Sequence, residues 1–185
     1  TLSYPIEDGV VTNWDEMEKI YEHIFKNELK VDPVEHNVFF IEPLINPKQN
    51  RESLVQLMFE SFNVSGMFLY LQVVCDLYAS GKFNGFVVDS GEGLTQFAAI
   101  REGYVLSESS MKINLAGGEA TNYMLKLLQE LGLNLTIDEK GIAREIKEKV
   151  CYIPLDFEEE MKGVESFDYE LPDGNKVIIK DQRIR

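Results

Sequence analysis

The glycine-rich turn Asp89-Ser90-Gly91-Glu92-Gly93 is the segment of this chain best suited to chemistry. It follows the apolar residues 86–88, so a carboxylate stands at the end of a predicted buried strand and two glycines stand in the turn. Glycine lets backbone N–H groups approach an anion closely, and a neighbouring carboxylate can hold Mg²⁺ directly or through water. The turn therefore predicts a phosphate and metal site, although the same residues also fit a hairpin turn that binds nothing.

The other reactive side chains indicate no second site. His23 and His36 have no histidine, cysteine or carboxylate partner at ligand spacing, so we do not expect either to bind a metal. No nucleophile is arranged with a base and an orienting group. Cys75 and Cys151 each lie in an apolar stretch, which predicts two buried free thiols and a reducing compartment.

The composition excludes several classes of protein. The 185 residues are 44% hydrophobic and carry a formal net charge of -14, as expected for a globular protein that does not bind nucleic acid or anionic membranes directly. Basic surfaces, metal ions and small ligands are the expected partners. The longest uncharged run, residues 61–75, is shorter than the ~20 apolar residues that a membrane span needs, so no span is predicted.

The first half of the chain has the pattern of alternating helices and strands that positions such a turn. Apolar spacing predicts a helix from Trp14 to near Leu29, with Asn13 as its cap, and a second helix over 51–62. Buried strands are predicted over 38–41 and 67–73, followed by a short helix over 74–79. This order indicates an α/β topology with a mainly parallel sheet.

The second half changes character after Phe83. Strand-like segments over 85–89, 94–100 and 104–106 are joined by short turns, as in antiparallel hairpins. Two helices, over 119–131 and 139–150, and a final hairpin around Asp173-Gly174 are predicted next. The acidic run 158–160 is predicted to be a solvated helix face.

Short blocks of residues occur in a distinctive order along the whole chain. They include Tyr4-Pro5-Ile6-Glu7, Asn13-Trp14-Asp15, Asn46-Pro47-Lys48, Leu77-Tyr78-Ala79-Ser80-Gly81, Asp89-Ser90-Gly91, Leu115-Ala116-Gly117, Ile146-Lys147-Glu148-Lys149 and Leu171-Pro172-Asp173-Gly174. In order and spacing these blocks resemble the actin family. The resemblance covers essentially all 185 residues with almost no shift in spacing, and several blocks are typical of actins and actin-related proteins rather than of sugar kinases and chaperones with the same fold.

The resemblance implies an α/β, actin-like (ribonuclease-H-like) nucleotide-binding fold, partial in this chain, with a helical and hairpin insertion lobe. Residues 1–79 would be part of the first lobe (subdomain 1-like), 80–115 the start of the second lobe with the phosphate hairpin (subdomain 3-like), and 116–185 the insertion (subdomain 4-like). Further segments of an actin would precede and follow this region, so we expect the chain to be part of a longer protein.

The resemblance also assigns roles to individual residues. ATP or ADP would be bound with Mg²⁺ (or Ca²⁺), the metal held by Asp89, most simply through water. Gln72 would orient the attacking water, and Gln72 and Asp89 would be the catalytic pair. Without the resemblance, Gln72 would be interpreted as a strand residue whose side chain contacts a backbone group. The nucleotide-binding positions would be Asp89, Ser90, Gly91, Glu92, Gly93, Leu94, Gly117, Lys147 and Glu148.

Several positions depart from the actin pattern, and two of them, Glu92 and Gln96, would lie beside the expected phosphates. Glu92 replaces an Asp, Gln96 replaces a His, Asp8 replaces the modified His, and Gly118 replaces an Arg. Because phosphoryl transfer depends on positioning and charge neutralisation, these changes predict slow or absent hydrolysis.

The resemblance therefore implies an ATP-binding cytoskeletal subunit of a filament or multiprotein complex. It would be in the cytoplasm or a nuclear complex, with other actin-family subunits and actin-binding proteins as partners. The alternatives are a nucleotide-independent scaffold of the actin-related class and a small-molecule kinase.

Overall fold

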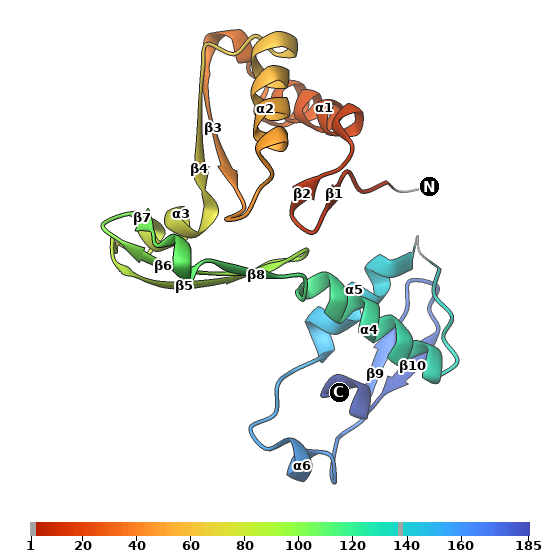
Figure 1. Ribbon diagram of the computed structural model, residues 1–185. Helices are drawn as coiled ribbons and strands as arrows, with labels where there is room; N and C mark the ends of the chain where they lie inside the picture. The colour runs from red at the N-terminus through yellow and green to blue at the C-terminus, as the bar shows by residue number, and fades with distance from the viewer. Residues whose placement is uncertain (1–2, 137–138) are drawn as a thin grey trace. The chain divides into compact units, whose positions relative to one another are not determined.

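The computed structural model describes residues 3–136 and 139–185, which form two compact units, Ser3–Ala116 and Gly117–Arg185 (Figure 1). Each unit combines helices with strands, so the architecture is of the mixed α and β kind that the sequence predicted. Among the described residues, none of the helices has the length and apolar character required to cross a membrane. The predicted boundary between residues 1–79 and 80–115, which would divide the first unit again, stays a prediction.

The first unit opens with a small hairpin and an amphipathic helix. Strands β1 (Ile6–Glu7) and β2 (Val10–Val11) are antiparallel, and helix α1 (Trp14–His23) follows. The side chain of Asn13 caps α1 by accepting a hydrogen bond from the amide of Glu16 at 3.2 Å, which confirms the predicted cap. The helix then widens into a π-helical segment, Ile24–Leu29, and ends where Lys30 adopts a left-handed conformation.

A parallel strand pair forms the next layer. Strand β3 (Asn37–Glu42) pairs with β4 (Gly66–Leu71), and the connection between them is helix α2 (Lys48–Gln56), prolonged by a π-helical segment over Leu57–Ser61. One face of the pair packs with α1 and α2 on a core that includes Phe25, Leu54, Met58 and Val64.

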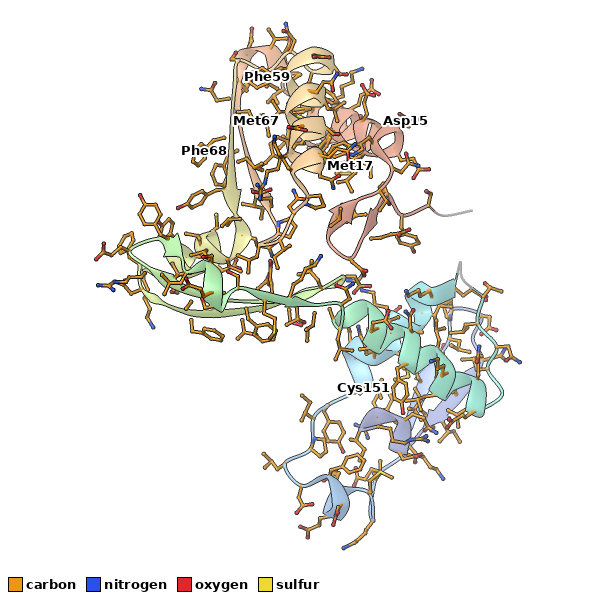
Figure 2. The ribbon with its side chains drawn as sticks, viewed as in Figure 1. Asp15, Met17, Phe59, Met67, Phe68 and Cys151 are labelled. Atoms are coloured by element: carbon orange, nitrogen blue, oxygen red, sulfur yellow. The ribbon has the colours of Figure 1, made fainter. Side chains whose placement is uncertain are left out.

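The other face of this pair is open, which corrects the prediction of two fully buried strands. Phe39 is 60% exposed and Phe68 58% exposed, and their rings stack 5.8 Å apart between centroids. Figure 2 shows the alternation directly: Met67 lies on the side of β4 that faces α2, and Phe68 lies on the opposite side. The strands thus have the period of two that a half-exposed sheet requires.

Helix α3 (Gln72–Ala79) begins directly after β4 and leads into an antiparallel sheet. Its strands are β5 (Gly85–Ser90), β6 (Thr95–Arg101), β7 (Tyr104–Val105) and β8 (Met111–Ile113). Strand β6 pairs with the other three, and all three pairings are antiparallel. Among residues 3–136 and 139–185, parallel pairing is confined to β3 and β4, so the sheets are not mainly parallel as predicted. The predicted strand 67–73 ends two residues early because Gln72 and Val73 are helical.

The second unit has its own core. Helices α4 (Gly117–Glu130) and α5 (Lys140–Val150) pack with the hairpin of β9 (Phe167–Glu170) and β10 (Lys176–Ile179), and a short helix α6 (Phe157–Glu160) carries the acidic run. Leu128, Ala143, Ile146 and Ile179 in this core are fully buried. Gly174 has φ +83° in the turn after β9, which confirms the predicted Asp-Gly hairpin.

Candidate functional site

The carboxylate of Asp89 is the centre of a side-chain cluster in the first unit. Its Oδ2 atom accepts a hydrogen bond from Nε2 of Gln72 at 2.8 Å and another from Nε2 of Gln96 at 2.6 Å. Asp89 and Gln96 are directly opposed in the β5–β6 register, and Gln72 is the first residue of α3. The side chains of Gln72 and Asp89, predicted as a pair, are therefore in contact. Gln72 is carried by the start of a helix rather than by a strand.

The turn between β5 and β6 offers main-chain donors beside this carboxylate. The turn is closed by a hydrogen bond from the amide of Gly91 to the carbonyl of Leu94 at 3.1 Å. The amides of Glu92, Gly93 and Leu94 have no hydrogen-bond acceptor among residues 3–136 and 139–185. Residues 91–93 are exposed. The unpartnered amides of Glu92 and Gly93 in this exposed turn, followed by that of the buried Leu94, suit an anion such as phosphate.

Gly93 allows the turn to lie against the β1–β2 hairpin. A Cβ atom at this position would stand 3.1 Å from the main-chain nitrogen of Gly9 and 3.5 Å from Cα of Asp8. Asp8, at φ +49°, accepts a hydrogen bond from Nδ2 of Asn114 at 2.7 Å. The β1–β2 turn is thus held between the glycine turn and the segment that follows β8.

The hydroxyl of Ser90 is committed within the protein. Thr95 Oγ1 donates to the carbonyl of Leu115 at 2.6 Å and lies 2.7 Å from Ser90 Oγ. Because each hydroxyl has one proton, Ser90 is the donor in its bond with Thr95. The Ser90 oxygen keeps its acceptor capacity, which suits a cation or a water molecule better than a phosphate oxygen.

The residues around Asp89 fit Mg²⁺ held largely through water. No cluster of three or more potential metal ligands exists in the described part of the chain. Mg²⁺ keeps several waters and commonly uses one or two carboxylates together with substrate phosphates, so the single carboxylate of Asp89 beside this turn is compatible with such a site. Desolvation, and then the negative charge of Asp89, raise the pKa of Asp76, one helical turn after Gln72.

The remaining predicted positions lie in the second unit. Nζ of Lys147 donates to the carbonyl of Gly117 at 2.8 Å and to Oγ1 of Thr121 at 2.9 Å, which ties α5 to the first turn of α4. Glu148 is exposed and pairs with Nε of Arg144 at 2.9 Å. Lys147 and Gly117 are therefore brought together, whereas the Glu148 carboxylate faces its own helix.

A cavity of about 340 Å³ adjoins Lys147 within this second unit. Its wall is mainly apolar and aromatic, formed by α4 residues such as Tyr123 and Met124 and by Cys151 and Tyr152. Burial raises the pKa of the Cys151 thiol, so this cysteine is a neutral wall residue. Cys75 and Cys151 are both free, as predicted, although each is only partly buried.

The chain matches the family model Actin over residues 1–185. The protein belongs to the actin family. Its mixed helices and sheets agree with an actin-like α/β fold.

The sequence indicated Gln96 only as a departure from the family pattern, and it gave no sign of Leu44 or Thr95. Gln96 is 1% exposed, and its Oε1 atom accepts from the amide of Leu44 at 2.7 Å. A polar residue amid the apolar positions of a strand, here Phe97 and Ala98, is the signal that could have identified it.

Proposed function

We propose that this protein is an actin-family subunit that binds ATP or ADP with Mg²⁺ (or Ca²⁺) and works in a cytoskeletal filament or multiprotein complex, with slow or absent hydrolysis. The observation that carries the proposal is the Asp89 carboxylate, held by two side-chain amides beside a turn with three unpartnered amides. Other actin-family subunits and actin-binding proteins are the partners proposed for it.

Each group near the turn has a chemical role in this proposal. The amides of Glu92, Gly93 and Leu94 would bind terminal phosphate oxygens, and Asp89 would hold the metal through water. A bound Mg²⁺ would neutralise phosphate charge. Gln72 keeps an amide oxygen with which to accept a hydrogen bond from water while its nitrogen donates to Asp89.

The contacts of Gln72 and the charge of Glu92 both favour slow hydrolysis in this proposal. One N–H of the Gln72 Nε2 group already donates to Asp89, which leaves its second N–H and its amide oxygen for an attacking water and restricts how the amide can turn towards that water. Glu92 adds a carboxylate in the exposed turn where negative phosphates would bind.

Isothermal titration of the protein, at its natural length, with ATP in Mg²⁺ and with ATP in EDTA tests the proposal. We expect binding at micromolar protein that is tighter with Mg²⁺. Asp89→Asn keeps the shape of the side chain but removes its charge, and we expect it to reduce the advantage of Mg²⁺ about tenfold or more. Asp168→Asn, an exposed position on β9, is the matched control and should bind as wild type does.

Two results would point elsewhere. Absence of heat with ATP would overturn the proposal in favour of a nucleotide-independent scaffold. Transfer of phosphate to sugars, measured against ATP alone, would indicate a small-molecule kinase.

A further inference from the structure

Gln96 is the most deeply buried polar side chain near the candidate site. It is 1% exposed and lies on β6 directly opposite Asp89. A buried amide is stable only when its oxygen and its nitrogen both find partners. Both do here: Oε1 accepts from the amide of Leu44 at 2.7 Å, and Nε2 donates to Oδ2 of Asp89 at 2.6 Å.

The partners of Gln96 fix which way its amide points. The main-chain N–H of Leu44 can only donate, so it must meet the oxygen of the Gln96 amide. The NH₂ group is thereby directed at Asp89. Leu44 is itself buried and follows β3, so this anchor comes from the parallel strand pair and not from the sheet that carries Asp89.

The second amide that donates to Asp89, that of Gln72, is less constrained than the amide of Gln96. Nε2 of Gln72 donates to the same Oδ2 atom at 2.8 Å, and Gln72 is only partly buried. A fully buried, anchored donor constrains a shared acceptor more than a partly exposed donor does. We therefore expect the Leu44 amide to fix the orientation of Gln96, and Gln96 to fix the orientation of the Asp89 carboxylate. The orientation of the Gln72 amide then follows from that of Asp89.

We propose that Gln96 is a positioning residue that holds the Asp89 carboxylate in the orientation needed to receive the hydrated metal of a nucleotide, and through Asp89 sets the amide of Gln72. This inference rests on the proposed function. It adds that the orientation of the Asp89 carboxylate depends on the loop after β3, through a buried residue whose amide oxygen and nitrogen are both bonded within the protein.

The test compares the Mg²⁺ advantage, the ratio of the Kd for ATP in EDTA to the Kd for ATP in Mg²⁺, across variants. Gln96→Met has similar length but neither donor nor acceptor, and we expect the ratio to fall about 10-fold to 100-fold. Gln96→His keeps one donor and one acceptor and should restore the ratio to within about threefold of wild type.

A control separates positioning from simple loss of stability. Leu54→Ala removes a buried side chain from the core between α2 and the strand pair, and should lower Tm without changing the ratio. If Gln96→Met does not fold, Gln96→Asn, too short to reach both partners, takes its place. Hydrogen exchange at the Leu44 amide gives a readout without ATP: protection should be lost in Gln96→Met and kept in Gln96→His.

The outcomes distinguish the two proposals. Wild-type protein that binds MgATP, with an unchanged ratio in Gln96→Met, would overturn the role of Gln96 and leave the proposed function standing. Wild-type protein that gives no heat with ATP would overturn both. A ratio that falls equally in Gln96→Met and Leu54→Ala would show that stability alone is responsible, which also rejects positioning.

Discussion

Asp76 shows how a single carboxyl group near the candidate site affects stability. Desolvation, and then the negative charge of Asp89, raise its pKa above the ordinary value of 3.8. The folded protein thus holds this proton more tightly than the unfolded chain does, and the resulting stability is present at low pH and is lost as the pH rises through the raised pKa. At neutral pH the ionised Asp76 is therefore a source of instability.

We expect Asp76→Asn to raise Tm by about 1–3 °C at pH 7 in EDTA, because the neutral amide avoids the unfavourable charge. The difference from wild type should shrink as the pH is lowered through the raised pKa of Asp76, because the carboxyl group then becomes protonated. Thermal melts followed by circular dichroism at several pH values measure this. A difference that is constant or grows as the pH falls would show that the charge of Asp76 is not the cause.

Single residues also mark the limit of what the sequence could predict. The types and order of residues 89–94 indicated an anion-binding turn, and the family resemblance added Gln72. The contacts of Gln96 could not be predicted from the sequence. Its partners Asp89 and Leu44 are 7 and 52 residues away, and only the strand register and the path of the main chain bring them together. The direction of the Glu148 carboxylate likewise depends on a helical neighbour, Arg144.

Among the secondary-structure elements, α1 depends on a cap that can be tested by itself. Asn13 accepts a hydrogen bond from the amide of Glu16, and removing such a cap costs about 0.5–2 kcal/mol. We expect Asn13→Ala to lower the free energy of unfolding by about 1 kcal/mol, seen as a lower urea midpoint at constant slope. Asn13→Ser retains a capping oxygen and should stay near wild type; equal losses in both variants would rule out capping as the cause.

Element positions were predicted well where a pattern is local and poorly where neighbours decide it. The two long helices of the second unit and the Asp173-Gly174 hairpin follow from apolar spacing and turn chemistry. The three-residue strand β8 is defined by its pairing with β6 rather than by its composition, so it was missed. The β4–α3 boundary at Gln72 was misplaced because Leu71 to Val74 are almost all apolar and fit strand or helix alike.

For the molecule as a whole, charge is the property that most directly affects a nucleotide. The 185 residues carry a formal net charge of -14, and ATP is an anion, so long-range repulsion from this part of the protein opposes their association. Salt screens this repulsion, since the Debye length falls from about 30 Å at 0.01 M to about 10 Å at 0.1 M ionic strength. A metal ion bound to the phosphates reduces the same repulsion by lowering the charge of the ligand.

We therefore expect ATP binding in EDTA to become about threefold tighter as the ionic strength rises from about 0.01 M to about 0.1 M, and MgATP binding to change less. Titrations at constant pH measure both. Neutralising the exposed acidic run on α6 with Glu158→Gln, Glu159→Gln and Glu160→Gln removes three charges without touching the turn, and should weaken the salt effect. Binding that weakens with salt would instead show that a local cation at the ligand outweighs the net charge, because an ion pair at the ligand is screened in the opposite sense.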